Sequence, residues 1–251
     1  MTKAKHATKR LDVLLVERGL AESVQKAQAM ILAGEVQVSG ARAEKAGARV
    51  AATAAVRVRS RVPKYASRGG IKLEGALADF GINVHGRVCL DIGSSTGGFT
   101  DCLLQHGAAR VYAVDVNVQQ LAWKLRQDPR VVQVKRNVRE LERQDLPEPP
   151  DLVVADVSFI SLKKILRATY LAARPEADFL LLVKPQFELP SKHVGPGGIV
   201  GDARLQEKAV AGVSKTATET GLEVVGVRAS SLRGAEGNQE YFVHACKKAL
   251  E

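Results

Sequence analysis

Hydrophobic residues follow two different periods along the chain, and the change between them divides it into two parts. In the first part, apolar residues spaced three and four positions apart predict two short helices, which Gly19 and Gly34 would end. Ser23 stands where an N-cap of the second helix is expected. Alternating residues predict half-buried strands at 36–38 and 56–58. The N-terminal part is therefore expected to be a small α+β module.

From residue 67 onward, apolar runs of strand length alternate with segments of helix length. The expected strands are 88–92, 111–115, 131–135, 151–156, 178–183, 222–228 and 241–246, and the expected helices lie near 70–80, 97–106, 117–127, 160–173 and 204–220. Buried strands separated by helices indicate an α/β fold with a mostly parallel seven-stranded sheet, Rossmann-like and covered on both faces. The last two strands have no helix between them and should be antiparallel. The predicted domains are 1–60 and 67–251, joined by a linker at 61–66.

The first of these strands runs into a glycine-rich turn with the pattern Asp91-x-Gly93-x-x-x-Gly97-Gly98. Glycines let the backbone approach a ligand closely, and the helix that follows presents free N–H groups. Asp115 ends the next strand, where a carboxylate can bind a ribose hydroxyl pair. An acid before the first glycine would oppose the pyrophosphate of a dinucleotide, so it suits a cationic ligand such as S-adenosylmethionine. An ordinary strand–turn–helix is the alternative.

Two further charged residues, Asp156 and Lys184, stand at the ends of later apolar strands. Ligand sites of open α/β sheets lie at these carboxyl ends. A lysine that closes a buried strand must be paired, neutral or functional. A purely structural Asp156–Lys184 salt bridge is the alternative to a catalytic role.

Positive charge is concentrated in the first third of the chain. The net charge is +10, and residues 1–72 hold 15 Lys and Arg against 5 Asp and Glu, whereas the remainder holds equal numbers of both. This asymmetry predicts a dedicated polyanion-binding part.

Membrane, metal and disulfide chemistry find no support in the sequence. The longest strongly apolar run, 179–183, is far shorter than the roughly 20 residues that span a bilayer. No signal peptide is recognisable, so we expect a cytoplasmic protein. Cys89, Cys102 and Cys246 lack metal-ligand spacing and are expected to be buried reduced thiols. His193 and His244 likewise lack partners at ligand spacing, and no metal is expected.

The N-terminal part resembles the S-four RNA-binding domain. The resemblance rests on Arg10-Leu-Asp-x-x-Leu-x-x-x-Gly19-Leu, on Ser23, Ala27 and Ile31, and on Gly34-x-Val36-x-Val38-x-Gly40. It implies that this part binds RNA, and the basic residues expected to contact RNA are Arg10, Arg18, Lys26, Arg42, Arg57, Arg59 and Arg68. A generic basic helical hairpin is the alternative.

The rest of the chain is similar to the FtsJ-type ribose 2′-O-methyltransferases, and within them to the TlyA family. The motifs are Ser67-Arg-Gly-Gly-Ile-Lys72, 91–100, Val154-Ala-Asp-Val-Ser-Phe-Ile-Ser161, Lys184-Pro-Gln-Phe-Glu188, Gly195-Pro-Gly-Gly198 and Gly237-Asn-Gln-Glu240. They appear in the order of the family and cover nearly the whole chain.

The resemblance implies a catalytic tetrad of Lys72, Asp156, Lys184 and Glu240. A ribose hydroxyl is a poor nucleophile until its proton is removed, and a lysine can serve as the base when its surroundings favour the neutral amine. Lys184 is the expected base, and Lys72 would supply a neighbouring positive charge. Asp156 and Glu240 would orient the two lysines.

The same resemblance implies a cofactor site for S-adenosylmethionine, formed by Asp91, Gly93, Ser95, Thr96, Gly97, Gly98, Asp115 and Asn137. Asn137 follows a strand and could instead be a turn residue. Phe159 and Tyr241 could stack on a flipped-out base or belong to the core.

Two features depart from the TlyA pattern. Tyr65 stands where a Trp is expected, which puts linker-based coupling of the domains in doubt. The chain stops soon after residue 246, as in the subgroup associated with the large-subunit cytidine. The expected function is 2′-O-methylation of a cytidine of 23S ribosomal RNA, with 16S RNA as a second candidate substrate, by a monomer that works on the ribosome without a membrane. The alternatives are a non-enzymatic RNA-binding assembly factor, a hemolysin and, least favoured, a dehydrogenase.

Overall fold

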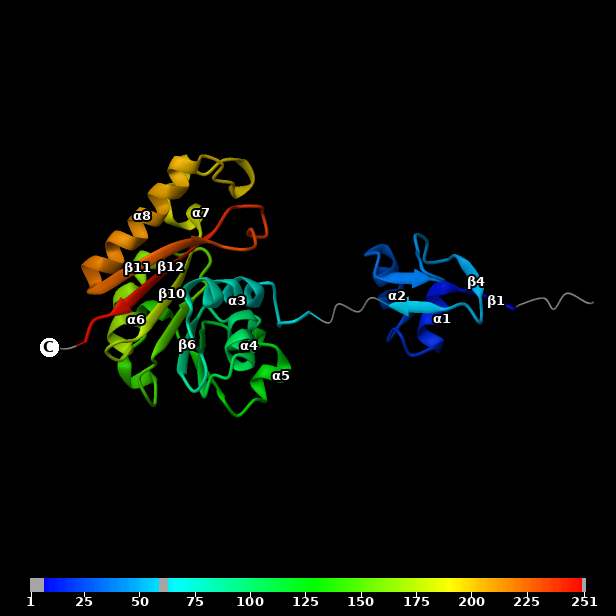
Figure 1. The fold of residues 1–251 in the computed structure, drawn as a ribbon, viewed down its shortest axis with the longest axis horizontal. Coiled ribbons are helices and arrows are strands. Elements are labelled where there is room, and N and C mark those ends of the chain that lie inside the picture. The colour runs from blue at the N-terminus through cyan, green and yellow to red at the C-terminus, as the bar shows by residue number, and fades with distance from the viewer. Residues whose placement is uncertain (1–6, 59–62, 250–251) are drawn as a thin grey trace, which may run out of the picture. The chain divides into compact units, whose positions relative to one another are not determined.

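The computed structural model describes residues 7–58 and 63–249, which fall into two compact units, Met1–Pro63 and Lys64–Glu251 (Figure 1). Of the residues named above, Arg59 lies outside the described part of the chain. Tyr65 and Ala66, which were expected in the linker, belong to the second unit. The domain boundaries proposed from the sequence stay predictions.

The first unit consists of two short helices and two small antiparallel sheets. Its elements are β1 (Thr8–Arg10), α1 (Leu11–Glu17), α2 (Val24–Leu32), β2 (Val36–Val38), β3 (Ala41–Arg42), β4 (Arg49–Ala51) and β5 (Val56–Val58). Strand β1 pairs with β4, and β2 lies between β3 and β5. Leu11, Leu15, Ala27, Ile31 and Val36 form its buried core.

The helix and strand predictions for this unit are confirmed. Ser23 caps α2, because its Oγ accepts a hydrogen bond from Lys26 N at 3.1 Å. Strands β1, β3 and β4 were not predicted. Each has only two or three residues, too few to show an alternating pattern.

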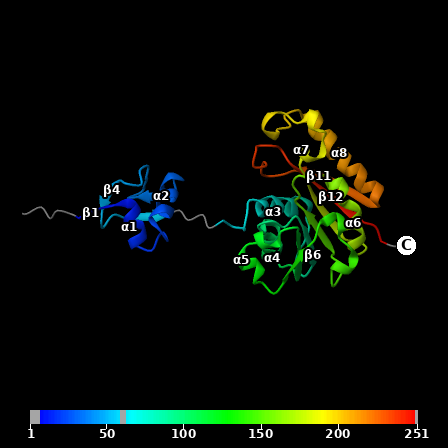
Figure 2. The ribbon, with the colours of Figure 1, turned by 180° about the vertical axis from the view of Figure 1, so that it is seen from behind.

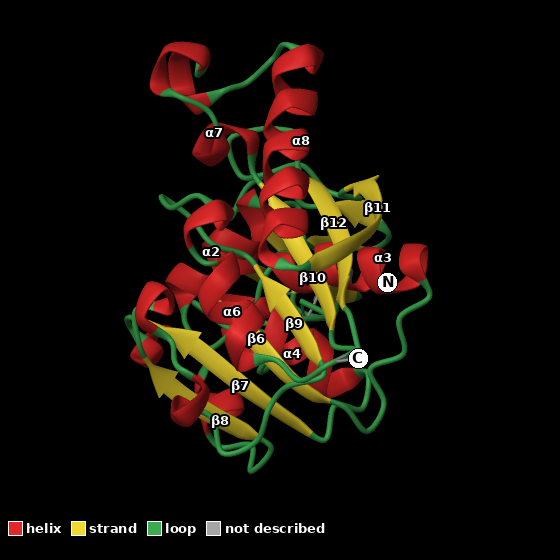
Figure 3. Ribbon diagram, turned by 90° about the vertical axis from the view of Figure 1, so that its left-hand side faces the viewer, coloured by secondary structure: helices red, strands yellow, loops and turns green. Residues whose placement is uncertain are grey.

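The second unit is built on one seven-stranded sheet in the order β11-β12-β10-β9-β6-β7-β8. The strands are β6 (Val88–Ile92), β7 (Arg110–Asp115), β8 (Val131–Lys135), β9 (Leu152–Ala155), β10 (Asp178–Val183), β11 (Leu222–Ala229) and β12 (Tyr241–Lys247). Strands β6 to β10 pair in parallel, whereas β12 runs antiparallel to both of its neighbours. The predicted α/β fold with a closing antiparallel pair is confirmed, and Figure 3 shows the strongly twisted sheet.

Helices cover both faces of this sheet (Figures 1 and 2). One face packs against α3 (Gly69–Phe80), α4 (Gly98–Gln105) and α5 (Trp123–Arg126), and the other against α6 (Leu166–Ala172) and α8 (Ala203–Thr220). The short helix α7 (Pro185–Glu188) follows β10 directly. This double cover explains why β6, β9 and β10 read as continuous apolar runs.

Two predicted helices are broken in the structure. The segment expected to be helical at 117–127 divides into the 3-10 turn Val118–Gln120 and α5, and the segment at 160–173 divides into Leu162–Lys164 and α6. In the first segment, Ala122 is non-helical, with φ −52° and ψ 137°, and its N–H donates to the carbonyl oxygen of Thr96 at 3.1 Å. The backbone is thereby drawn to the glycine turn, and this tertiary contact overrides local helix propensity.

Candidate active site

Two adjoining cavities lie at the carboxyl ends of the parallel strands. The larger has a volume of about 310 Å³ and is lined by Gly93, Ser95, Val114, Asp115, Val116, Gln120, Arg136, Asn137, Val138, Asp156, Val157, Ser158 and Ile160. The smaller, of about 160 Å³, is lined by Ser67, Gly69, Lys72, Gly93, Ser94, Ser95, Thr96, Gly98, Phe99, Asp156, Ser158 and Lys184. Gly93, Ser95, Asp156 and Ser158 belong to both linings, so the two cavities are continuous parts of one site.

Gly93 is where the strand β6 turns into the site, and only glycine fits there. Its φ is +79°, and a Cβ at this position would lie 2.6 Å from the carbonyl oxygen of Asp156. Gly97 has φ +95°, and a Cβ there would collide with the side chains of Leu121 and Leu125. The glycine turn is therefore pressed between the β9 end and the α5 segment.

Asp115 and Asn137 line the larger cavity, on the side away from the lysines. The carboxylate of Asp115 accepts hydrogen bonds from Ser95 N at 3.0 Å and from Asn117 N at 2.9 Å. Asn137 caps the 3-10 turn that follows it, through its Oδ1 and Arg139 N at 3.2 Å. Asn137 is thus a turn residue, which was the alternative predicted from the sequence, and it also lines the cavity.

Asp91 does not line either cavity, contrary to the expectation that it faces the ligand directly. It is fully buried, and Thr100 Oγ1 donates to its Oδ2 at 2.6 Å. Burial raises the pKa of Asp91 to about 7, although the bond from Thr100 opposes the shift. Its Oδ1 is buried and without a hydrogen-bond partner among the described residues. A cationic group bound at the adjoining glycine turn would stabilise the ionised form of this carboxylate, so the site fits a positively charged ligand.

Three of the four expected tetrad residues line the smaller cavity: Lys72 from α3, Asp156 after β9 and Lys184 after β10. Both lysines therefore meet at one cavity. Lys184 Nζ lies 2.6 Å from Asp156 Oδ1 and donates to Ser158 Oγ at 2.9 Å. Glu240, just before β12, is 2% exposed and pairs with Lys72.

Ser67, Phe99 and Ser158 line the smaller cavity and were not chosen from the sequence. Ser67 opens the Ser67-Arg-Gly-Gly motif, and Ser158 stands two residues after Asp156, so a signal for both was present in the chain. Phe99 lies within the 91–100 motif, so the chain carried a signal for it as well. Its ring lies 6.2 Å from that of Phe242, which makes it a core residue with one edge at the site.

Phe159 and Tyr241, the two aromatic candidates, differ completely in their surroundings. Phe159 is 92% exposed and has φ +63°, which is strained for a bulky side chain. The core alternative is therefore wrong for Phe159. Tyr241 packs against the core on the face of the sheet that α6 and α8 cover, and its hydroxyl donates to Gln206 Oε1 at 2.7 Å. Tyr241 is not free to stack on a base.

The basic residues expected to contact RNA have different local roles. Lys26, Arg42 and Arg57 are exposed. Arg10 pairs with the buried carboxylate of Asp12 at 2.7 Å, and this hydrogen bond lowers the pKa of Asp12. The guanidinium of Arg18 donates to the carbonyl oxygens of Ala52 and Ala54. Arg68, which is exposed in the second unit, donates to the main-chain oxygen of Arg233 at 3.2 Å.

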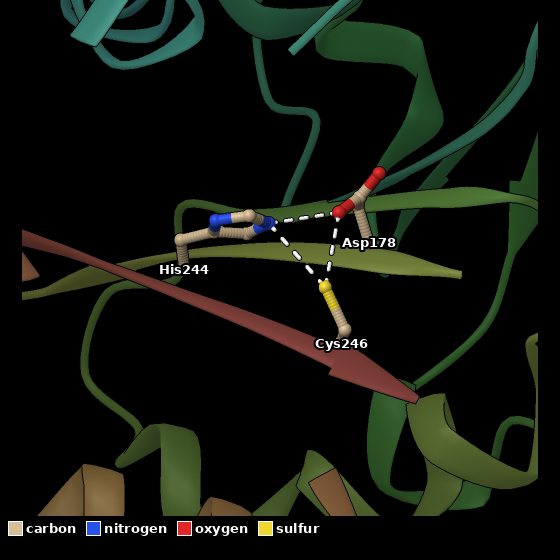
Figure 4. A group of neighbouring side chains, drawn as sticks. All are labelled: Asp178, His244 and Cys246. Atoms are coloured by element: carbon tan, nitrogen blue, oxygen red, sulfur yellow. Dashed lines mark hydrogen bonds and ion pairs between the residues drawn. The ribbon is translucent and has the colours of Figure 1, made fainter. Parts of the chain in front are cut away.

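A separate polar cluster at the opposite end of the sheet corrects the expectation that His244 has no partners. His244 and Cys246 on β12 meet Asp178, the first residue of β10, as Figure 4 shows. His244 Nε2 lies 2.8 Å and Cys246 Sγ 3.2 Å from Asp178 Oδ1, and Arg87 binds Oδ2 at 2.5 Å. Burial raises the pKa of Asp178, but these hydrogen bonds outweigh it and lower the pKa to about 2. Cys246 is only half-buried, whereas Cys89 and Cys102 are buried as predicted.

Both units match known families. Residues 65–247 match the FtsJ-like methyltransferase family, and residues 9–56 match the S4 domain.

Two curated relatives and one solved structure share most of the chain. A 16S/23S rRNA (cytidine-2′-O)-methyltransferase TlyA of Mycobacterium tuberculosis is 50% identical over 93% of this chain and 88% of its own. A 23S rRNA (cytidine-2′-O)-methyltransferase TlyA of Campylobacter jejuni is 36% identical over 73% of this chain and 71% of its own. A solved structure named as a hemolysin, from Streptococcus thermophilus, is 40% identical, covers 97% of this chain and 90% of its own, and superposes with a TM-score of 0.74.

Proposed function

We propose, because the chain belongs to the FtsJ-like methyltransferase family, that it transfers a methyl group from S-adenosylmethionine to the ribose 2′-hydroxyl of a cytidine in 23S ribosomal RNA. The observation that carries the proposal is the convergence of Lys72, Asp156 and Lys184 on one cavity beside the glycine turn. These three residues come from separate parts of the chain. A purely structural salt bridge between Asp156 and Lys184 would not require Lys72 at the same cavity.

The chemistry follows from the placement of the two amines. Lys184 is the proposed base: its Nζ lies at the cavity, held by Asp156 and Ser158, and after passing one proton to Asp156 its free amine would accept the proton of the attacking hydroxyl. Lys72 places a second positive charge at the same cavity, where it would stabilise the developing alkoxide. Glu240 keeps Lys72 oriented from behind. The residues thus position and deprotonate the nucleophile.

The cofactor would occupy the larger cavity, with its ribose at Asp115, its adenine at Val116, Asn137 and Val138, and its methionine part at the glycine turn. When bound, S-adenosylmethionine supplies a methyl group made electrophilic by a sulfonium. The orphan carboxylate oxygen of Asp91 supports this assignment, because a buried acid beside the turn favours a cationic ligand.

Ribosomal RNA is the proposed partner. The S4 match, the excess of basic residues before position 73 and the exposed Lys26, Arg42 and Arg57 support RNA binding by the first unit. The Mycobacterium and Campylobacter relatives both act on a cytidine of 23S RNA, and the former also on 16S RNA. Arg10 and Arg18 are held by contacts within their own unit, and we assign them to the scaffold of the RNA-binding surface.

The test is methyl transfer to ribosomes isolated from cells that lack the modification. The protein and labelled S-adenosylmethionine should mark the 2′-oxygen of one cytidine in the 50S subunit. RNA binding without any transfer would favour an assembly factor instead.

One relative named as a hemolysin makes membrane activity the second candidate. None of the helices described for residues 7–58 and 63–249 combines the length and apolar character that crossing a bilayer requires. Release of dye from protein-free liposomes by the purified chain would support the hemolysin reading over methyl transfer.

A further inference from the structure

We infer that Glu188 is a positioning residue, which clamps the loop after β9 to helix α7 and so holds the target-nucleotide side of the site. The inference rests on the proposed function for its catalytic meaning, but the clamp itself is a property of the fold.

The loop after β9 contains a strained backbone. Residues 156–161 connect Asp156 at the cavity to the 3-10 turn Leu162–Lys164. Within it, Phe159 has φ +63° and a side chain that is 92% exposed. A left-handed conformation at a bulky residue costs free energy and persists only where the surrounding contacts fix it. Because Phe159 is so exposed, most of those contacts must come from the residues on either side of it.

Glu188 provides them on the C-terminal side of the loop. Its carboxylate accepts hydrogen bonds from Ser161 Oγ at 2.5 Å and from Leu162 N at 2.7 Å. Lys163 Nζ donates to the main-chain oxygen of Glu188 at 3.1 Å. The side chain of Glu188 is only 1% exposed, so these bonds form out of water, where a bound carboxylate is held firmly.

The other side of the loop is fixed by the catalytic end of β10. Lys184 Nζ bonds to Ser158 Oγ, and the ring of Phe187 lies 5.2 Å from that of Phe159. Lys184, Phe187 and Glu188 all belong to the same short segment. One rigid segment therefore sets the position of the proposed base and, through Glu188, the position of the strained turn that faces it.

A turn held in this way places Ser158 against Lys184, the proposed general base, and keeps the side chain of Phe159 exposed to solvent. Loss of the clamp would let the backbone at Phe159 relax toward negative φ. The distance between loop and base would then vary, which reduces the rate of the chemical step more than the affinity for the ribosome.

The first measurement is independent of activity: hydrogen–deuterium exchange of residues 156–162 in the full chain, for Glu188→Gln and for Ser161→Ala. We expect faster exchange in this segment, most of all at the amide of Leu162. Asp178→Asn is the matched control, because Asp178 is a hydrogen-bonded acid at the start of β10, the strand that precedes α7 and Glu188. Unchanged exchange in Glu188→Gln would overturn the clamp whether or not the chain methylates RNA.

The second measurement is methyl transfer to undermodified ribosomes under saturating conditions. Glu188→Gln should lower kcat about ten- to a hundredfold with little change in KM for the ribosome. Asp178→Asn should lower the melting temperature and leave kcat unchanged. Equal losses of kcat in the two variants would show that Glu188 acts only through stability and would refute its positioning role. Absence of transfer by the unaltered protein would instead overturn the proposed function, and the exchange data would still decide the clamp.

Discussion

Lys72 and Glu240 form a buried ion pair that joins α3 to the start of β12, across 168 residues of chain. Their side chains are only 9% and 3% exposed. Gly234 makes room for the carboxylate, because a Cβ there would lie 2.6 Å from Glu240 Oε1. The pair leaves the ammonium of Lys72 at the wall of the smaller cavity, next to the proposed base.

Replacing Glu240 alone should be costly. In Glu240→Leu, Lys72 would remain as a buried charge without its partner, and we expect a loss of about 3 kcal/mol in the free energy of unfolding together with loss of transfer. The double variant Lys72→Met/Glu240→Leu should regain part of that stability and stay inactive. Urea unfolding and the ribosome assay measure the two effects separately. A double variant with normal turnover would contradict the electrostatic role of Lys72.

Lys184→Ala should reduce methyl transfer by about 10²- to 10⁴-fold, the usual contribution of a general base. Binding of S-adenosylmethionine, measured by calorimetry, should persist because Lys184 lines the smaller cavity and not the larger. Lys215→Ala is the control, since this lysine is exposed on α8 and pairs with Glu219 on the same helix. Turnover that survives in Lys184→Ala would exclude it as the base.

Asp91 should make the stability of the unliganded protein fall as the pH rises. Its pKa is raised from 3.8 to about 7 in the folded state, so between these values the folded chain keeps a proton that the unfolded chain has released. The contribution of Asp91 is complete below pH 4 and is lost as the pH passes 7. From pH 5 to pH 8 this amounts to about 2 to 3 kcal/mol. Asp91→Asn should show that much less pH dependence in urea titrations, and identical slopes for both proteins would disprove the assignment.

Phe159→Asn should separate binding from folding. Asparagine tolerates φ +63° better than phenylalanine, and the lost side chain is exposed, so the free energy of unfolding should be unchanged or higher. If Phe159 stacks on the target base, kcat/KM for methyl transfer should fall by an amount equivalent to about 1 to 3 kcal/mol, the free energy of one base–aromatic stack. Leu171→Asn, at another exposed apolar position on α6, should keep full activity. Full activity of Phe159→Asn would remove Phe159 from the site.

Gly93→Ala should abolish cofactor binding. Its methyl group would meet the main-chain oxygen of Asp156, which cannot move without shifting the catalytic loop. Gly81→Ala is the matched control, because Gly81 has a similar φ of +65° and nothing within 4 Å of the added carbon. The control should lose only about 1 kcal/mol of stability and bind S-adenosylmethionine normally. Equal effects of the two changes would mean that the positive φ alone, and not the contact with the main-chain oxygen of Asp156, makes glycine necessary at position 93.

Much of the catalytic fold could be read from the chain, because buried parallel strands are continuous apolar runs with polar residues at their ends. The predicted strands, the antiparallel closing pair and the cap at Ser23 were confirmed for this reason. Ala122 shows the limit of such predictions, because its hydrogen bond to Thr96 interrupts a helix that local propensity favours. Asp178, His244 and Cys246 show the same limit, since only the pairing of β10 with β12 brings them together.

Local patterns along the chain were enough to predict the class of fold, the glycine turn and the charged strand ends, because hydrophobic periodicity and the placement of glycines are local properties. Which side chains face the site became clear only from the packing of distant segments: Asp91 is buried behind the turn, Ser158 lies beside Lys184, Phe159 is held outward and Glu188 clamps its loop. The physical reason is that a side chain's direction and partners depend on the packing of segments distant in the chain, and a single sequence does not record which segments meet.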